Sequence, residues 1–377
     1  MSPSLRFPEF TGEWERCVLG DVLEFSNTRI NSSELNSGNY VSTENILQNF
    51  QGIVKARSIP EDTNVMAFSC GNILLSNIRP YLKKVWKATF NGGCSSDVFV
   101  LQANSNIDAD YLHYVVANDK FIGFVMNGTK GVKMPRGDKN QMKTYSLSLP
   151  SIKEQRKISR FLSFLDERIA VQNRLIEDLK KLRCAIVEKM FKQSKANGRL
   201  GDFIEQVSVR NKNGLYSNVL SVSNKQGFVK QSEQFEDRTV ASEDTSNYKI
   251  VKRNNFAYNP ARINVGSIAR LTKFDVGIVS PMYVCFRTKA SIIPEYMEAF
   301  FTSQQFFYEM MKRLEGSVRL CLSYEGLCNI PVYIPDMNKQ IAMGQNISLI
   351  LSKIGLEIEY LGRLHQQKQY LLRKMFI

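Results

Sequence analysis

The chain has few of the residues on which enzymes most often rely. It contains two histidines, His113 and His365, and seven cysteines that never fall in a C-x-x-C spacing. A histidine-dependent triad, a zinc site and a disulfide framework therefore have little support, and we expect both histidines to be surface or packing residues. The sequence also lacks a G-x-x-x-x-G-K-[ST] loop and a G-x-G-x-x-G after an expected strand. We expect no catalytic residue, no metal and no cofactor.

Long apolar runs are missing as well. No stretch approaches the roughly 18 uncharged apolar residues that a membrane-spanning helix requires. The first residues lack the apolar core of a signal peptide. We therefore expect a cytoplasmic protein without a membrane partner, whose cysteines are reduced thiols.

Acidic residues are outnumbered. The chain has 50 Lys and Arg against 36 Asp and Glu, which gives a formal net charge of +14. Such an excess favours a polyanionic partner, because each phosphate that is neutralised releases condensed counterions. The charge therefore predicts binding to double-stranded DNA; the alternative is a basic surface that only aids solubility.

One sequence unit occurs twice. Residues 150–191 align with 335–376 without a gap, at an offset of 185 residues. Both stretches carry a Gln five positions after a Pro and end in Lys-Met-Phe, and Leu-Gly-Asp occurs at 19–21 and again at 200–202. The chain of 377 residues is therefore about two copies of one unit.

The stretches 1–148 and 197–333 are typical of mixed, strand-rich domains. Apolar runs that follow turn residues, such as 73–75 and 98–101, predict strands. The stretch from Ala109 predicts a helix that ends near Asn118 as its C-cap. The second copy repeats this layout at 219–222, 255–258, 282–284 and 294–297. Because the residues differ while the layout is shared, we expect one fold directed at two targets.

The stretches 149–196 and 334–377 predict two long helices. Steps of four and three residues along each give a seam with eight apolar positions of ten. Its apolar members are Ile158, Leu162, Leu165, Ile169, Ile176, Leu179, Ile186 and Met190, and Met343, Ile347, Ile350, Ile354, Leu361, Leu364, Leu371 and Met375. Polar residues interrupt both seams at matching places, Gln172 with Glu357 and Arg183 with Lys368.

A sustained 3.5-residue period with matched interruptions predicts that the two helices pair with each other. An amphipathic helix can also pack on its own domain alone, but a helix of about 40 residues is about 60 Å long, more than the width of a small domain. The predicted fold class is α+β: two similar mixed α/β domains separated by two long helices that form an antiparallel coiled coil, with pseudo-twofold symmetry.

Lys and Arg gather at equivalent places of the two globular copies, among amide and aromatic residues. Arg and Lys bind phosphates, and Arg, Asn and Gln make bidentate contacts to bases. The candidate DNA-binding residues are Arg79, Lys83, Lys84, Lys87, Lys130, Lys133, Arg136 and Lys139 in the first copy, and Lys252, Arg253, Arg262, Arg270 and Arg319 in the second. The alternative is that these side chains are only solvated.

Two further motifs lie at the start of the chain and at the first junction between domain and helix. The first is Leu5-Arg6-Phe7-Pro8, followed by Gly12, Trp14 and Leu19-Gly20-Asp21, and the second is Leu149-Pro150-x-x-x-Glu154-Gln155-x-x-Ile158-x-x-Phe161-Leu162. Together they resemble the specificity subunits of type I restriction-modification systems, and the order domain, helix, domain, helix extends the resemblance to the whole chain. The second copy departs from the pattern at 338–339 and at Met343, so its junction need not contact a partner identically.

The resemblance implies a non-catalytic subunit with two target-recognition domains, each binding one half of a split DNA target, and helices that set the gap. It also implies assembly with two modification subunits, which use S-adenosylmethionine, and with restriction subunits, which hydrolyse ATP. The alternative from another class is a non-enzymatic coiled-coil adaptor that recruits protein partners and has an incidental basic surface. A lone DNA nuclease or methyltransferase comes third, because its motifs are missing.

Overall fold

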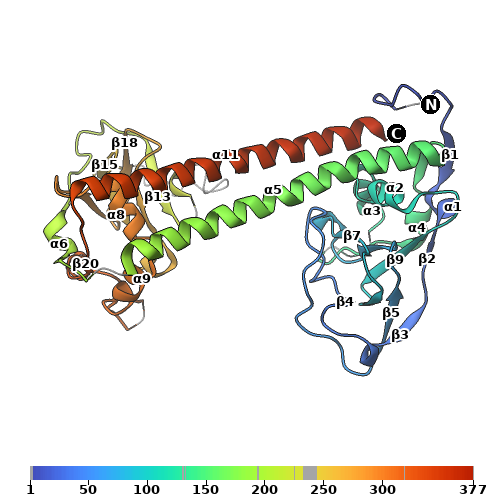
Figure 1. The fold of residues 1–377 in the computed structure, drawn as a ribbon, viewed down its shortest axis with the longest axis horizontal. Helices are drawn as coiled ribbons and strands as arrows, with labels where there is room; N and C mark the ends of the chain where they lie inside the picture. Colours follow the sequence, from blue (N-terminus) through green and yellow to red (C-terminus); the bar gives the residue numbers. More distant parts are fainter. Residues whose placement is uncertain are drawn as a thin grey trace. The chain divides into compact units, whose positions relative to one another are not determined.

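The fold consists of two compact units. The computed structural model describes residues 3–129, 131, 133–192, 195–224, 226–231, 244–317 and 319–376. Unit 1 comprises Met1–Gln172 and Tyr360–Ile377, and unit 2 comprises Asn173–Glu359 (Figure 1). Among the described residues, no helix is both long enough and apolar enough to span a membrane.

Two long helices each contribute to both units. They are α5 (Ile152–Lys192) and α11 (Met337–Met375). The other elements of unit 1 are β1 (Glu15–Val18), α1 (Leu19–Val22), β2 (Leu23–Phe25), β3 (Arg29–Asn31), η1 (Ser32–Glu34), β4 (Tyr40–Val41), β5 (Asn64–Phe68), β6 (Ile73–Ser76), η2 (Pro80–Leu82), β7 (Val85–Lys87), β8 (Gly92–Cys94), β9 (Val98–Ala103), α2 (Ala109–Val116), α3 (Asp119–Asn127), α4 (Lys139–Lys143) and β10 (Ser146–Leu149).

Unit 2 has a similar order of elements, which differs between its first and inner strands. Its elements are β11 (Gly198–Arg199), α6 (Leu200–Phe203), β12 (Ile204–Gln206), β13 (Val219–Ser223), β14 (Gly227–Lys230), β15 (Lys249–Lys252), β16 (Phe256–Tyr258), η3 (Ile263–Val265), β17 (Ile268–Arg270), β18 (Val276–Val279), β19 (Val284–Thr288), α8 (Pro294–Phe300), α9 (Gln304–Met311), α10 (Tyr324–Cys328) and β20 (Pro331–Val332). The prediction of two similar mixed α/β domains is confirmed.

One sheet is the same in both units, and the other differs at an edge. The orders β2-β9-β6-β7 and β12-β19-β16-β17 are equivalent. In the second sheets, β4 pairs in parallel with β8 as β13 does with β18. The fourth strand, however, is β3 beside β5 in unit 1 and β14 beside β13 in unit 2. The two domains thus share a framework and expose different sheet edges.

The Leu-Gly-Asp repeat has the same structural role in each unit. The carboxylates of Asp21 and Asp202 accept the backbone N–H of Val18 and Arg199, at 3.0 and 2.8 Å, and so cap the short helices α1 and α6. A side chain on the glycine has little room, since a Cβ at Gly20 would lie 3.1 Å from the Cβ of Lys143. The motif therefore marks a turn with close packing.

The helix predicted from Ala109 to about Asn118 is α2, and a second helix, α3, begins directly after Asn118. α2 ends at Val116, and the side chain of Asn118 accepts the backbone N–H of Lys120, which makes Asn118 the N-cap of α3. The prediction of Asn118 as a C-cap is therefore wrong. Asn is favoured at both kinds of helix end, and the sequence pattern alone did not separate them.

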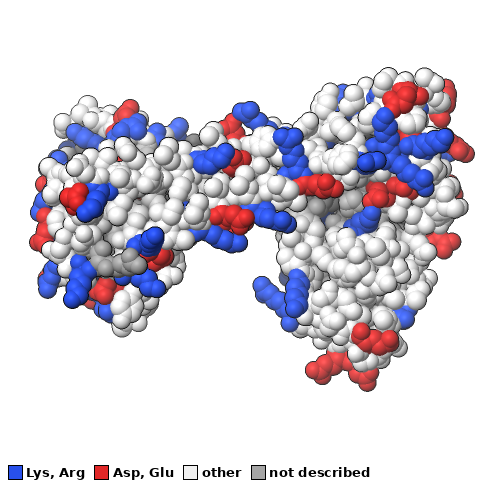
Figure 2. Space-filling view, in the orientation of Figure 1, with Lys and Arg blue, Asp and Glu red and all other residues white. Residues whose placement is uncertain are grey.

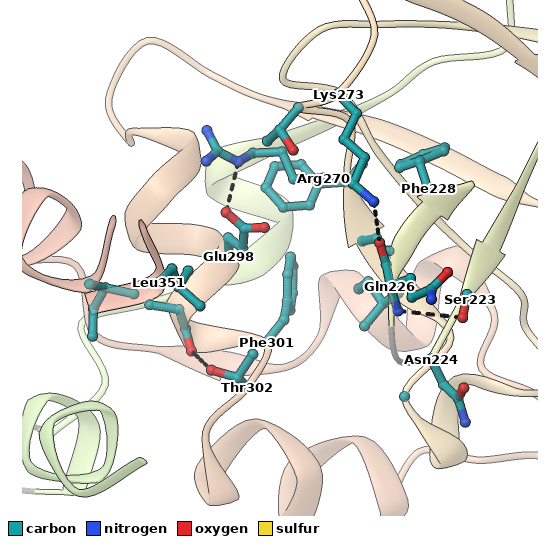
Figure 3. Close-up of a pocket in the computed structure, with 18 of the residues that line it drawn as sticks. Ser223, Asn224, Gln226, Phe228, Arg270, Lys273, Glu298, Phe301, Thr302 and Leu351 are labelled. Atoms are coloured by element: carbon teal, nitrogen blue, oxygen red, sulfur yellow. Dashed lines mark hydrogen bonds and ion pairs between the residues drawn. The ribbon is translucent and has the colours of Figure 1, made fainter. Parts of the chain in front are cut away.

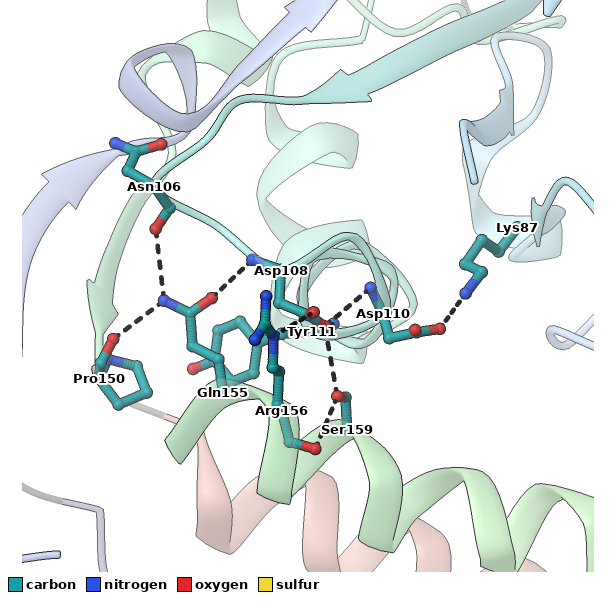
Figure 4. A network of polar contacts seen from close by, with 9 residues as sticks. All are labelled: Lys87, Asn106, Asp108, Asp110, Tyr111, Pro150, Gln155, Arg156 and Ser159. Atoms are coloured by element: carbon teal, nitrogen blue, oxygen red, sulfur yellow. Dashed lines mark hydrogen bonds and ion pairs between the residues drawn. The ribbon is translucent and has the colours of Figure 1, made fainter. Parts of the chain in front are cut away.

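The repeated Gln ties each long helix to the domain before it. In unit 1, Gln155 accepts the backbone N–H of Asp108 at 2.8 Å and donates to the carbonyls of Pro150 and Asn106 at 2.9 and 3.5 Å (Figure 4). The equivalent residue of unit 2, Gln340, accepts from Ile293 at 3.0 Å. Because these backbone groups lie at the start of α2 and α8, the Gln fixes each helix against its domain.

The repeated Lys-Met-Phe places a phenylalanine in the core of the unit in which the helix ends. Phe376, just after α11, stacks on the buried Tyr111 of unit 1 with ring centroids 5.1 Å apart. Phe191, near the end of α5, contacts Tyr296 and Phe300 of unit 2 at 5.3 and 5.2 Å. The predicted division into segments 1–148, 149–196, 197–333 and 334–377 treats each helix as separate, whereas the compact units divide both helices. The reason is that each helix end completes a domain core.

Inside unit 1, the ends of the two helices pair in antiparallel fashion. Lys368 of α11 lies 2.5 Å from the carboxylate of Asp166 in α5, and Tyr360, two turns earlier in α11, lies against Arg168, two residues later in α5. The predicted seam residues of both helices are buried or half-buried. Lys368, one of the matched polar interruptions, therefore makes an ion pair within unit 1.

Glu154 anchors the segment before β1. Its carboxylate accepts two hydrogen bonds from the guanidinium of Arg6, at 2.7 and 2.8 Å, and one from the indole of Trp14 at 3.3 Å. The side chain of Glu154 is 2% exposed. Charge-assisted bidentate contacts of this kind are among the stronger hydrogen bonds in proteins.

We expect Glu154→Ala to lower the free energy of unfolding of unit 1 by about 2–3 kcal/mol, because it leaves a guanidinium and an indole N–H without their acceptor. The matched control is Lys339→Ala at the equivalent position of the second copy, where the side chain is exposed and the effect should stay within about 0.5 kcal/mol. Denaturant unfolding of both variants measures the difference, and equal losses would contradict the anchoring role.

Candidate nucleic-acid interface

An exposed arginine follows the equivalent inner strand of each unit. β6 leads into η2 and β16 leads into η3, and Arg79 and Arg262 are the N-cap residues of these two short helices. Arg79 has a φ of 51°, in the left-handed region where few non-glycine residues lie. Its backbone N–H is held by the carbonyl of Pro135 at 2.8 Å. The fold therefore presents the same residue type at the same place twice.

A second loop is fastened to each of these turns. In unit 1, Gly137 donates its N–H to the carbonyl of Asn77 at 3.1 Å, which ties the loop between α3 and α4 to the turn. In unit 2, Leu322 donates to the carbonyl of Pro260 at 3.1 Å and ties down the loop between α9 and α10. The tied loops carry Lys133 and Arg319, both exposed.

We call Arg79 and Lys133 the basic turn of unit 1, and Arg262 and Arg319 the basic turn of unit 2. No carboxylate of the described residues lies within 4 Å of any of these four side-chain cations. Each basic turn therefore keeps positive charge available for an external anion.

Other predicted residues have internal partners. Acidic side chains neutralise five of them: Lys83 by Asp119 at 2.7 Å, Lys87 by Asp110, Arg136 by Asp97 at 3.3 Å, Arg253 by Asp275 at 2.7 Å, and Arg270 by Glu295 and by Glu298 at 2.9 Å. Figure 2 shows the same interspersion of Lys and Arg with Asp and Glu over the visible face of each unit. These five are weaker candidates for an interface.

Arg270 is largely enclosed. Its side chain is 9% exposed, and its guanidinium also donates to the amide oxygen of Asn254 at 3.1 Å. Burial raises the pKa of Glu298, and the neighbouring Arg270 opposes that rise. This cluster stabilises the packing of β17 against α8.

The remaining predicted residues have mixed surroundings. The ammonium of Lys84 donates to the carbonyl of Thr43 at 2.5 Å, and that of Lys139 lies 5.5 and 5.2 Å from the ring centroids of Phe25 and Phe99. Lys252 is exposed. Lys130 lies outside the described residues.

Neither histidine lies in a cluster of metal-ligating side chains. Among the residues that the structure describes, no group of three or more His, Cys, Asp or Glu could hold a metal ion. Burial is the main cause that lowers the pKa of His113, to about 4, and it also lowers the pKa of His365. Both imidazoles are therefore neutral at pH 7.

The repeated sheet order and the two long helices describe a protein of two similar mixed α/β units that share two long helices. Residues 11–181 match the model of the type I restriction modification DNA specificity domain. The match covers somewhat less than half of the chain, so over these residues the chain is similar to that family. The resemblance to specificity subunits that the sequence motifs indicated is confirmed.

Two curated relatives are similar over part of the chain. The specificity subunit of the type I restriction enzyme EcoDI of Escherichia coli is 28% identical over 129 residues, which cover 33% of this chain and 29% of that protein. The MjaVIII specificity subunit of Methanocaldococcus jannaschii is 26% identical over 200 residues, which cover 50% of this chain and 43% of that protein. The matched stretches thus span less than half of either relative.

Solved structures are similar over the whole chain. The crystal structure of a type I restriction-modification S subunit from M. genitalium has a TM-score of 0.60 at 17% identity, and covers 100% of this chain and 99% of that one. A chain from a study of complex assembly and conformational transition of the type I R-M system has a TM-score of 0.58 at 15% identity, with 97% and 98% covered. At these identities, the likeness concerns the fold.

Proposed function

We propose that this chain is the DNA-reading subunit of a type I restriction-modification complex and that it recognises a bipartite target, with one domain for each half-site. The observation that carries the proposal is the duplicated basic turn, in a chain whose residues 11–181 match the model of the type I DNA specificity domain. Two copies of one exposed cationic feature suit a ligand that presents phosphates twice. Their different neighbours suit two half-sites of different sequence.

The charges and side chains support direct reading of DNA. Arg and Lys neutralise phosphates and position the protein, and Arg also makes bidentate contacts to guanine in the major groove. The formal net charge of +14 adds attraction that does not depend on sequence. In this proposal, the basic turns contact DNA directly, while cations with internal acidic partners chiefly stabilise the domains.

The long helices would set the separation between the half-sites. α5 has 41 residues and α11 has 39. Each begins in one compact unit and ends in the core of the other. Because an α-helix rises about 1.5 Å per residue, such helices are long enough to span more than one turn of DNA, about 34 Å.

The same helices would receive the partner subunits. Several large apolar side chains on them are more than half exposed, among them Val171 and Phe164 on α5 and Leu349 and Leu356 on α11. Exposed apolar residues of this size mark interaction surfaces. We propose that they bind the two modification subunits, with restriction subunits joining the full complex. Methyl transfer and ATP hydrolysis would then belong to the partners.

The proposal is tested by binding of the chain, with its modification subunits added, to a duplex carrying the target. Mapping methylated adenines across the host genome supplies that target and its gap. We expect scrambling of either half-site to reduce affinity toward the non-specific level, about 1,000-fold or more, and affinity to fall steeply with salt. Equal binding to intact and scrambled duplexes would instead favour a protein-recruiting adaptor with an incidental basic surface.

A further inference from the structure

Unit 2 contains a pocket that reaches Gly266, the C-cap of η3, whose N-cap is Arg262 of the basic turn. It has a volume of about 480 Å³ and lies between the β13–β14 hairpin, β17, α8 and the long helices (Figure 3). Phe256 and Phe301 supply aromatic walls, Gln226 supplies an amide, and Arg183 of α5 supplies a cation. Its size and mixed lining are typical of sites for small molecules.

The equivalent place in unit 1 is filled by the chain itself. The hydroxyl of Tyr114 in α2 donates to the carboxylate of Asp166 in α5 at 2.8 Å. Lys368 of α11 makes an ion pair with the same carboxylate at 2.5 Å, and its ammonium lies 5.7 Å from the centroid of the Tyr114 ring. An aromatic ring, a carboxylate and a cation therefore form one internal assembly.

The repeat offset of 185 residues identifies the counterparts in unit 2. Ala299 replaces Tyr114, Leu351 replaces Asp166, and Arg183 replaces Lys368. All three line the pocket. Unit 2 thus has neither the ring of Tyr114 nor the carboxylate of Asp166 at these positions, but it has a cation, Arg183, where unit 1 has Lys368. The absence of the ring and the carboxylate explains why unit 2 has a pocket at the place that unit 1 fills.

The retained cation has an incomplete set of partners. Among the described residues, no carboxylate lies within 4 Å of the guanidinium of Arg183. Glu298 also lines the pocket; its carboxylate is held by Arg270 at 2.9 Å and interacts with Arg183 only at longer range. A second cation of the lining, the ammonium of Lys273, donates to the carbonyl of Gln226 at 3.4 Å. The charge in the pocket therefore favours an anion.

We propose that this pocket binds a small planar aromatic anion. The ring occupies the space that Tyr114 fills in unit 1, between Phe301 and the aliphatic residues of α11. The anionic group contacts Arg183, as the carboxylate of Asp166 contacts Lys368. The site lies next to the basic turn of unit 2, because Gly266 at the end of η3 lines it, but Arg262 itself is not among the lining residues.

The test uses the full-length chain and isothermal titration calorimetry with phenylacetate and phenyl phosphate, which separate carboxylate from phosphate. We expect saturable binding of at least one of them, and at least about 10-fold weaker binding of acetate, inorganic phosphate and benzyl alcohol, each of which lacks the ring or the charge. The proposal would be overturned if benzyl alcohol bound as tightly as phenylacetate or phenyl phosphate. It would also be overturned if neither of these two aromatic anions bound.

Variants locate the site. Arg183→Gln should weaken binding of the aromatic anion at least about 10-fold, whereas Lys368→Gln, the matched change in the filled unit, should leave it unchanged. The double variant Ala299→Tyr with Leu351→Asp rebuilds the plug of unit 1 and should abolish binding while circular dichroism remains unaltered. If that double variant does not fold, the comparison of Arg183→Gln with Lys368→Gln decides, and equal affinities of those two variants would refute the assignment.

Discussion

Simultaneous replacement of Arg79 and Arg262 with alanine is expected to weaken specific DNA binding by about 30-fold to 20,000-fold. A bidentate arginine contact to a base contributes about 1–3 kcal/mol, so the loss of two such contacts costs about 2–6 kcal/mol. If the two residues contact phosphates instead, affinity falls on all sequences alike and the salt slope decreases by about one unit for each residue. Titration of intact and scrambled duplexes at several salt concentrations separates these outcomes.

The matched control is Lys87→Ala with Arg253→Ala. These residues also belong to the predicted set, one in each domain, but each already has an acidic partner, Asp110 and Asp275. We expect this double variant to bind specific DNA within about threefold of the unchanged chain, since surface ion pairs contribute little and their cations are already neutralised. Equal losses in the two double variants would show that the basic turns have no special role.

The largest loss of stability is expected from Phe191→Ala. Phe191 is 1% exposed and packs against Tyr296 and Phe300. Truncation of a buried phenylalanine removes its transfer free energy and leaves a cavity, which together cost about 3–5 kcal/mol. Denaturant or thermal unfolding should show the destabilisation in unit 2, although Phe191 comes from the helix that begins in unit 1.

Leu182→Ala on the same helix is the control for that experiment. Its side chain is 50% exposed, so its truncation should change stability by less than about 0.5 kcal/mol. A small effect of Phe191→Ala, or an effect on unit 1 alone, would contradict the finding that the end of α5 completes the core of unit 2.

Local signals in the sequence were sufficient for the secondary-structure elements and their duplication. Apolar runs after turn residues predicted β6 and β9, and the seam pattern predicted α5 and α11, because burial on one side imposes a period that can be read directly. The repeated Leu-Gly-Asp marked a capped turn in each unit. Asn118 was misassigned because its side chain can cap a helix at either end.

The candidate interface was only partly predictable. Lys83, Lys87 and Arg79 belong to one stretch that contains no acidic residue, so sequence treated them alike. The fold brings Asp119 and Asp110 from α3 and α2 to the first two and no described carboxylate to the third. Whether a cation is available to bind DNA therefore depends on acidic residues more than twenty positions away in the sequence. No local sequence pattern predicts such contacts.

The sequence by itself determined that this protein has two copies of a mixed α/β domain, two long helices and a surplus of positive charge, because repeats, periods and composition are properties of the chain. The tertiary structure alone decided that each helix ends in the core of the second unit it enters, and that no carboxylate of the described residues pairs with Arg79 or Arg262. It also decided that unit 2 is hollow where Tyr114 fills unit 1. These features depend on which side chains meet across long separations in sequence, and that is settled only when the domains pack.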